Sequence, residues 1–244
     1  MERESTVTPR RRRDAGILQI TERDMICLTW IGEQFCISFD HLRRLLGRHA
    51  KAPTKTPDML SISATRDTLE RWLQLDLIES PRKIIAEHPP FVWLSRRGLT
   101  QLGLSYSYYE PRPATIRHFY AVNAIRLALE SFALQCSWVS YRTLRRYAEP
   151  TPLPDAELHA RAFPLIAVQV IERPTLQDIT LHDELETLVS LATRAQGNAQ
   201  RYTRLWYFLH TAIVPIIREA LVTFDPQIQK RVTLFGLDAQ ELDP

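Results

Sequence analysis

The segment that decides the fold of the N-terminal half runs SISATRDTLERWLQLDLI, from Ser61 to Ile78. Several of its apolar residues recur at the spacing that places side chains on one face of a helix. Polar and charged residues fill many of the other positions, so one face is predicted to meet a core and the other to meet solvent. The residues predicted to face the core are Ile62, Leu69, Trp72 and Leu73.

Two shorter helices are predicted upstream of this segment. Thr21 followed by Asp24 is a helix start signal, and apolar residues follow it at helical spacing. Ser38 can cap a second helix whose leucines share one face, and Gly47 can end that helix. A polar, proline-containing loop over residues 49–58 then leads into the long segment.

The chain downstream of Ile78 predicts a β-hairpin and a closing helix. Apolar residues at 84–85 and 91–94 flank a turn that contains two prolines, the pattern of two strands around a tip. Residues 94–99, LSRRGL, then open a further helix. Three helices followed by a hairpin is the order of a winged-helix domain, which we place at residues 17–109.

The polar face of the third predicted helix has the chemistry of a surface that reads DNA. A helix fits the major groove, where its N-terminal side chains reach base edges and flanking basic residues hold phosphates. Arg66 is suited to a bidentate contact with guanine, although Asp67 and Glu70 oppose a polyanion. The alternative is an ordinary solvated face on a domain that binds protein. The predicted DNA-binding residues are Ser63, Thr65, Arg66, Thr68 and Arg71 on the helix, with Arg82 and Lys83 on the wing.

Residues 1–16 are polar and rich in arginine, without helical or strand periodicity, which predicts a flexible basic arm. The net charge of the chain is +3, and all of this excess lies in residues 1–110. A polyanion would therefore dock on the N-terminal half. The arm would then reach an adjacent minor groove or serve only as a solubilising tail. Its predicted DNA contacts are Arg10, Arg11, Arg12 and Arg13.

The composition changes after a stiff, proline-rich linker at residues 110–114. A long helix is predicted over residues 116–134, and strands then mix with helices. Such alternation indicates an α/β domain with a mostly buried sheet, which we place at residues 115–244. The predicted strands cover residues 137–141, 156–159, 165–171, 205–209 and 231–235, and the predicted helices cover residues 176–193 and 212–223.

Several classes of protein are disfavoured by the composition. The three cysteines are scattered and lack the spacing of zinc ligands, so we expect free thiols in a reducing compartment. The chain has seven glycines and no glycine-rich loop, which disfavours nucleotide hydrolysis. It also contains no GxSxG motif, no apolar run long enough to span a membrane and no signal peptide. We therefore expect a cytoplasmic protein that does not bind a membrane.

Four short motifs are distributed over both halves of the chain. They are LSRRGL at residues 94–99, His118 with Val122 and Asn123, PDAEL at residues 154–158 and LWYF at residues 205–208. Together they resemble the replication-relaxation family, which is found on bacterial plasmids and mobile elements. Members of this family join a winged helix to a restriction-endonuclease-like α/β core. The resemblance implies the same α+β or α/β architecture here, in a protein associated with a plasmid or the nucleoid.

The resemblance also implies a candidate metal site. Nucleases with this core place an Asp after a Pro on one strand, and an acid, one spacer and a Lys on the next; the carboxylates hold Mg²⁺ and the Lys orients water. Asp155 matches the first position. On the next strand Gln169 stands at the acid position and Ile171 at the lysine position, while the register that uses Glu172 meets Pro174. No register restores the full set, so the domain is predicted to be catalytically degenerate.

The sequence leaves three functions open. The favoured one is a DNA-binding protein without a cofactor that assists or regulates replication, transfer or transcription of a mobile element. The second is a metal-dependent nuclease or DNA-relaxing enzyme that uses Asp155 with Mg²⁺. The third is a protein-interaction subunit of a larger nucleoprotein complex. Double-stranded DNA is the predicted partner, with a second copy or other replication and transfer proteins as further candidates, and His118 is expected to be a structural histidine.

Overall fold

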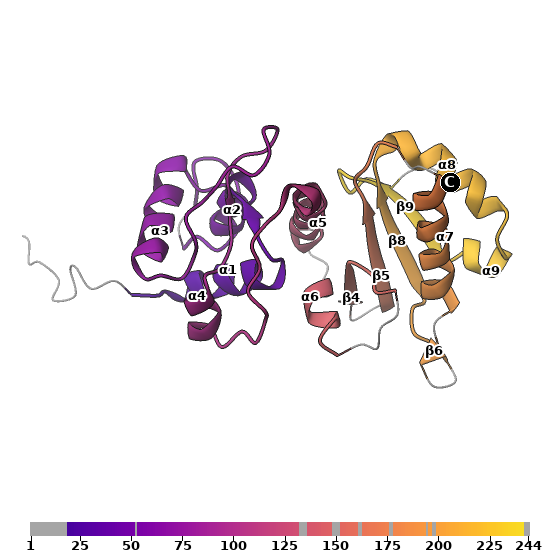
Figure 1. Cartoon of the computed structure of the whole chain (residues 1–244), viewed down its shortest axis with the longest axis horizontal. Helices are drawn as coiled ribbons and strands as arrows, with labels where there is room; N and C mark the ends of the chain where they lie inside the picture. Colours follow the sequence, from indigo (N-terminus) through magenta and orange to yellow (C-terminus); the bar gives the residue numbers. More distant parts are fainter. Residues whose placement is uncertain are drawn as a thin grey trace, which may run out of the picture.

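The computed structural model has an N-terminal part, residues 19–109, and a C-terminal part, residues 136–241, with helix α5 (Pro113–Ser131) between them (Figure 1). The predicted basic arm, with Arg10, Arg11, Arg12 and Arg13, lies outside the described residues. The structure describes residues 19–51, 53–131, 136–147, 152–160, 163–175, 178–193, 195–196 and 199–241.

The first three helices of the N-terminal part begin at side chains that cap them. A capping box between Thr21 and Asp24 starts the first helix, as predicted. Ser38 and Ser61 cap the next two, each accepting a hydrogen bond from a backbone amide of the first turn. The apolar faces of all three meet in one core that contains Trp72. These helices are α1 (Glu22–Glu33), α2 (Phe39–Arg48) and α3 (Ile62–Gln74).

The predicted wing is a hairpin, but its first strand lies earlier in the chain than expected. The prediction of a strand at residues 84–85 is wrong, because these two isoleucines lie in the loop of the hairpin. They pack against a buried cluster of Cys36, Phe91, Trp93 and Ile116, the last on α5, so burial of their side chains replaces continued pairing of the strands. The pairs are Ile78 with Leu94, Arg82 with Phe91, and strand β2 (Phe91–Val92) with β1 (Ile37–Ser38).

The closing helix α4 (Arg96–Gln101) follows the hairpin, as predicted. Ser95 caps it and donates a hydrogen bond of 2.5 Å to the carbonyl oxygen of Asp76. Gly98 on this helix lies directly against the backbone of Leu77, so that a methyl group at this position would overlap the Leu77 carbonyl. The glycine of the LSRRGL motif is therefore needed for close packing of α4 on the end of the α3 segment.

Helix α5 packs on both parts of the molecule. Leu127 belongs to the core of the N-terminal part, whereas Val122, Ile125 and Leu129 belong to a core formed with the sheet. Pro113 starts the helix, so the predicted linker extends into its first turn, where proline is favoured. One helix is thus buried on two sides and joins the two parts.

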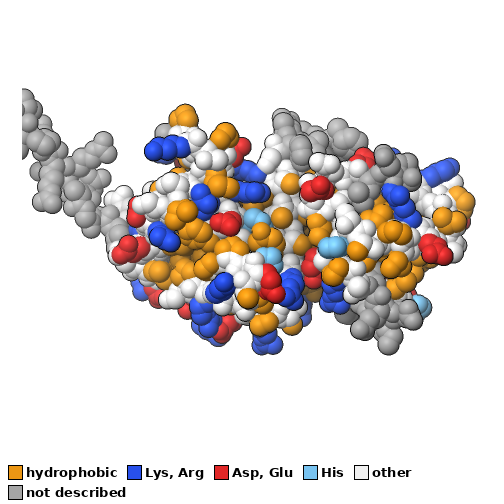
Figure 2. All heavy atoms as spheres, turned by 90° about the horizontal axis from the view of Figure 1, so that it is seen from above, with side chains coloured by type: hydrophobic (Ala, Val, Ile, Leu, Met, Phe, Trp, Pro, Cys, Tyr) orange, Lys and Arg blue, Asp and Glu red, His pale blue; other side chains and the backbone are white. Residues whose placement is uncertain are grey.

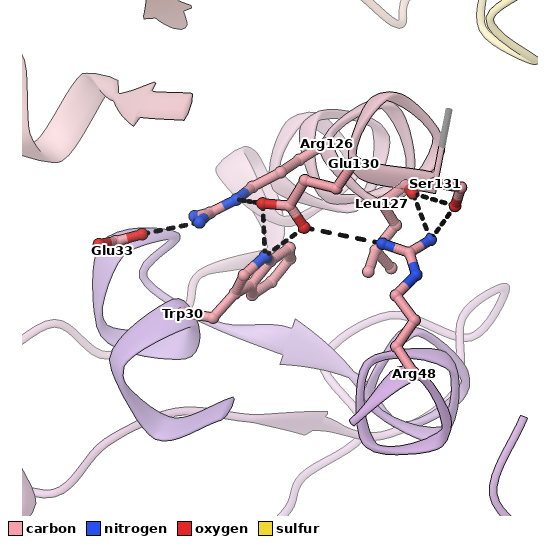
Figure 3. Close-up of polar contacts among 7 residues, drawn as sticks. All are labelled: Trp30, Glu33, Arg48, Arg126, Leu127, Glu130 and Ser131. Atoms are coloured by element: carbon pink, nitrogen blue, oxygen red, sulfur yellow. Dashed lines mark hydrogen bonds and ion pairs between the residues drawn. The ribbon is translucent and has the colours of Figure 1, made fainter. Parts of the chain in front are cut away.

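Polar contacts from α5 reinforce this junction (Figure 3). Arg126 binds Glu33 at 2.8 Å and Glu130 at 2.7 Å, and its guanidinium lies 4.6 Å from the ring centroid of Trp30. Arg48 of α2 donates to the Leu127 carbonyl and to Ser131. Buried charges that are paired in this way fix the orientation of the elements that carry them.

The C-terminal part is a five-stranded sheet in the order β3-β4-β5-β8-β9. The first three strands pair antiparallel, and β5, β8 and β9 pair parallel. All five predicted strands are present, with bounds that shift by one or two residues. The strands are β3 (Cys136–Ser140), β4 (Ala156–Ala160), β5 (Phe163–Ile171), β8 (Arg204–Leu209) and β9 (Val232–Gly236).

Helices cover both faces of this sheet (Figure 1). Helix α5 covers one face, while α7 (Asp178–Thr193) and α8 (Val214–Val222) cover the other. The chain is therefore a mixed α and β protein, as predicted. In the described residues no helix has the length and apolar character needed to cross a membrane. The remaining elements are α6 (Tyr141–Leu144), β6 (Ala195–Gln196), β7 (Ala199–Gln200), η1 (Thr211–Ile213) and α9 (Pro226–Gln229).

Candidate nucleic-acid interface and carboxylate centre

Helix α3 lies at the outer end of the N-terminal part, on the side away from the sheet (Figure 1). Ser63 and Arg66 are exposed there, as predicted. No ion pair occupies Arg66 among the residues that the structure describes. We call the exposed side of this helix the recognition face. It consists of Ile62, Ser63, Arg66, Asp67, Glu70 and Gln74.

Two predicted DNA contacts on α3 are buried instead. The exposed fraction of Thr65 is 0% and that of Thr68 is 2%, so the prediction that they face solvent is wrong. Their hydroxyls donate to the carbonyl oxygens of Ser61 and Ala64, each at 2.9 Å, which satisfies them without water. Ile62, predicted to face the core, is 47% exposed because it lies on the first turn of the outer face.

Arg71 forms an ion pair within the protein. Its Nη2 donates to the Asp24 Oδ1 at 2.6 Å, and the indole nitrogen of Trp72 donates to the same oxygen at 3.0 Å. Burial raises the pKa of Asp24, but hydrogen bonds from Thr21 and Trp72 and the charge of Arg71 outweigh it and lower the pKa. Arg71 therefore joins α3 to α1 and is not free for a base contact.

The two predicted DNA contacts on the wing differ in what they touch. Arg82 pairs with Glu110 and lies 4.8 Å from the ring centroid of Trp93, whereas Lys83 is exposed. The loop of the hairpin is packed on α5, where the rings of His88 and Tyr120 stack with centroids 4.1 Å apart. The end of the wing is therefore turned toward the junction rather than extended beside α3.

A groove beside the N-terminal end of α3 gathers basic side chains that the sequence interpretation did not single out. It has a volume of about 890 Å³ and lies between the start of α1, the loop after α2 and the start of α3. No carboxylate is among the described residues that line it. Each cation was visible in the sequence, but only the fold brings them together. This basic groove is lined by Arg23, Arg43, Lys51 and Lys55.

The charge elsewhere on the N-terminal part is mixed. On the face shown in Figure 2, Lys and Arg side chains alternate with Asp and Glu over this part of the molecule. A broad positive field is therefore not present on that face, in keeping with the small net charge of +3. The basic groove is a local feature beside α3.

The structure brings together Asp155 and Glu172, two of the three residues suspected of catalysis, through His118 of α5. The His118 Nε2 lies 2.8 Å from Asp155 Oδ1, and its Nδ1 lies 3.3 Å from Glu172 Oε2. The other oxygen of Asp155 accepts a hydrogen bond of 2.8 Å from the backbone nitrogen of Val170. We call His118, Asp155 and Glu172 the histidine–carboxylate centre.

The charges of this centre stabilise one another. Burial lowers the pKa of His118, but Asp155 and Glu172 outweigh it and raise the pKa to about 10. Burial raises the pKa of Glu172, and the hydrogen bond from His118 reverses this and lowers it. The two acidic side chains thus favour the protonated form of His118. His118 is hydrogen-bonded and partly buried, with 29% of its side chain exposed, and its structural role stays a prediction.

Gln169, the third suspected residue, does not join this centre. It lies on β5 in register with Tyr207 of β8, on the face of the sheet that α7 covers. Among the described residues, no partner reaches the Gln169 Oε1, the Tyr207 Oη or the Glu184 Oε2. Burial, and then the charge of Asp155, raise the pKa of Glu184 to about 6.

The arrangement of acidic side chains does not form a set of metal ligands. No group of three or more His, Cys, Asp or Glu side chains in the described part of the chain is placed to hold an ion. The imidazolium of His118 already binds one oxygen of each carboxylate in the centre.

No known protein family model matches this sequence, and neither curated proteins nor solved structures give a match.

Proposed function

We propose that this protein binds double-stranded DNA, with the recognition face in the major groove and the basic groove on backbone phosphates. The observation that carries the proposal is the placement of the free cation Arg66 and the basic groove on one outer end of the molecule. A helix that presents its polar side outward has room to enter a groove. The helix order and hairpin support a winged-helix interpretation of this part.

The position of each side chain on this surface indicates whether it would contact bases or phosphates. Arg66 and Ser63 lie on the first turns of α3, from which side chains reach base edges. Lys51 and Lys55 are exposed on the loop that precedes the helix, where they suit phosphates, which position a protein without reading sequence. Asp67 and Glu70 on the same face repel a misplaced backbone and favour one docking register.

The resemblance to the replication-relaxation family supports the wider role that we propose. In that role the protein is cytoplasmic, acts on the DNA of a plasmid or mobile element, and assists or regulates replication, transfer or transcription. The C-terminal part, which we interpret as a restriction-endonuclease-like domain without its catalytic set, would serve as a surface for assembly. We do not propose nuclease activity, because His118 binds both candidate carboxylates.

The test uses fluorescence anisotropy to compare the affinities of wild type and Arg66→Ala for a labelled duplex library. A base contact by arginine contributes about 1–3 kcal/mol, so we expect affinity for selected sites to fall roughly five- to 150-fold. The matched control is Arg97→Ala, an arginine on α4 that is 62% exposed and lies 3.9 Å from Asp76. Equal affinities of wild type and Arg66→Ala for every selected site would reject the proposal.

A further inference from the structure

Aromatic rings and guanidinium groups alternate in a column near helix α6, in a region that the proposed duplex surface does not use. Arg142 lies 4.7 Å from the ring centroid of Phe35 and 4.7 Å from that of Tyr106. Arg146 lies 5.5 Å from the Tyr106 ring and 5.4 Å from the Tyr147 ring. The order is thus Phe35, Arg142, Tyr106, Arg146, Tyr147, which we call the aromatic column.

The inner end of the aromatic column is held rigidly. Arg142 is buried, and it donates to the carbonyl oxygen of Gly32 at 2.6 Å and to that of Ser107. The Tyr106 hydroxyl forms a hydrogen bond of 2.8 Å with the Thr143 hydroxyl. These contacts fix the inner rings before any ligand arrives, so little conformational entropy is lost when the column is extended.

The outer end of the column is open to solvent. Tyr147 is 79% exposed, and Arg145 and Arg146 beside it are exposed as well. Neither arginine forms an ion pair with a residue in the described ranges. The outer end therefore presents one aromatic ring and two guanidinium groups to solvent.

A groove of about 460 Å³ runs beside the column. No carboxylate is among the described residues that line it. The hydroxyls of Tyr106, Tyr108 and Tyr109 already bond to other side chains, and Arg142 bonds to two backbone carbonyls. The exposed guanidinium groups of Arg145 and Arg146 are the groups that can donate hydrogen bonds to phosphate oxygens.

We propose that this groove binds single-stranded DNA. A base stacked on the free face of Tyr147 would continue the column, and its phosphates would lie on Arg145 and Arg146. Bases in a duplex are already stacked and cannot reach the ring, which separates this ligand from the one proposed for α3. An acidic peptide would use the two arginines but would leave the ring unused.

Two observations favour the single strand over an acidic peptide. The guanidinium groups are sandwiched with rings, so the column presents a π surface at its end and not a bare cluster of charge. The groove also combines several tyrosines with arginines, which is the composition of surfaces that bind single strands without sequence preference. Cations without aromatic rings would bind an acidic ligand equally well.

The experiment compares a fluorescein-labelled dT 12-mer with a 12-mer of abasic sites, both titrated with the full chain. Stacking of one base predicts that Tyr147→Ala weakens dT binding roughly five- to hundredfold and that Tyr147→Phe retains it. Arg145→Ala combined with Arg146→Ala weakens binding of both oligomers. Because Tyr147 and the two arginines are exposed, these variants keep the fold, which circular dichroism checks.

Arg66→Ala is the control that separates this site from the duplex site, since it should leave dT binding unchanged while it weakens duplex binding. The proposal is overturned if Tyr147→Ala binds dT as tightly as wild type does. It is also overturned if wild type binds the abasic oligomer as tightly as dT, or if polyglutamate displaces dT at the same charge concentration as the abasic oligomer does.

Discussion

Cations at the outer end of α3 and cations around α5 differ in what they contact. Arg126 binds two glutamates, and His118 binds Asp155 and Glu172. In the described residues, Arg66 and the lysines of the basic groove form no ion pair. A buried, paired cation holds elements together, whereas a free, exposed cation remains available to a polyanion. The paired cations around α5 are therefore structural, whereas Arg66, Lys51 and Lys55 are the candidate binding cations. Arg43, which also lines the basic groove, pairs with Asp40 at 3.8 Å.

The variant Arg126→Ala tests this contrast with the largest expected effect, which is a loss of stability. This change leaves Glu33 without its ion-pair partner, takes one of two cations from Glu130 and removes the guanidinium from Trp30. The free energy of unfolding in a urea titration should fall by about 3 kcal/mol. The control Arg66→Ala should change it by less than about 0.5 kcal/mol. Similar losses in the two variants would remove the distinction.

A second prediction concerns the pH dependence of stability at the histidine–carboxylate centre. His118 has its pKa raised from 6.5 to about 10 in the folded protein. Its contribution is thus fully present below pH 6.5 and is lost as pH rises toward 10. The difference in unfolding free energy between wild type and His118→Asn should shrink from pH 7 to pH 10.

The measurement stays above pH 7 because Glu184, whose pKa is raised to about 6, titrates below this range in wild type. Other groups that titrate near pH 10 are common to wild type and variant, so they cancel in the difference. A difference that stays constant across this range would show that His118 is not charged when folded.

A smaller effect, close to zero, is expected in a nicking assay. His118 contacts both Asp155 and Glu172, and the lysine position of the nuclease motif holds Ile171. Supercoiled plasmid incubated with wild type and Mg²⁺ or Mn²⁺ should therefore remain supercoiled, as judged on an agarose gel. Nicking by wild type that Asp155→Ala abolishes would restore the nuclease alternative.

The sequence predicted most elements of the fold because their signals are local. Capping residues such as Thr21 and Ser38, and apolar residues at helical or strand spacing, act within a few positions along the chain. The error at residues 84–85 has a tertiary cause, since these isoleucines pack against a cluster that joins Phe91 and Trp93 to Cys36 and to Ile116 of α5. Tertiary packing overrode the local pattern there.

The candidate sites were less predictable because they depend on contacts between distant residues. His118 lies 37 positions from Asp155 and 54 from Glu172, so no spacing rule joins them. Thr65 and Thr68 look polar in the sequence, yet their hydroxyls bond to carbonyls one turn earlier and both residues are buried. The prediction that Arg71 contacts DNA is wrong because Arg71 binds the buried carboxylate of Asp24, and only the fold brings these two residues together.

The salt dependence of duplex binding tests the central claim most directly. Each lysine that neutralises a phosphate adds about 0.9 to the slope of log affinity against log salt. Wild type and Arg97→Ala should share one steep slope, and Lys51→Ala combined with Lys55→Ala should give a slope shallower by roughly two phosphate contacts. Parallel lines for the double variant and wild type, or no duplex binding by wild type at low salt, would contradict the account.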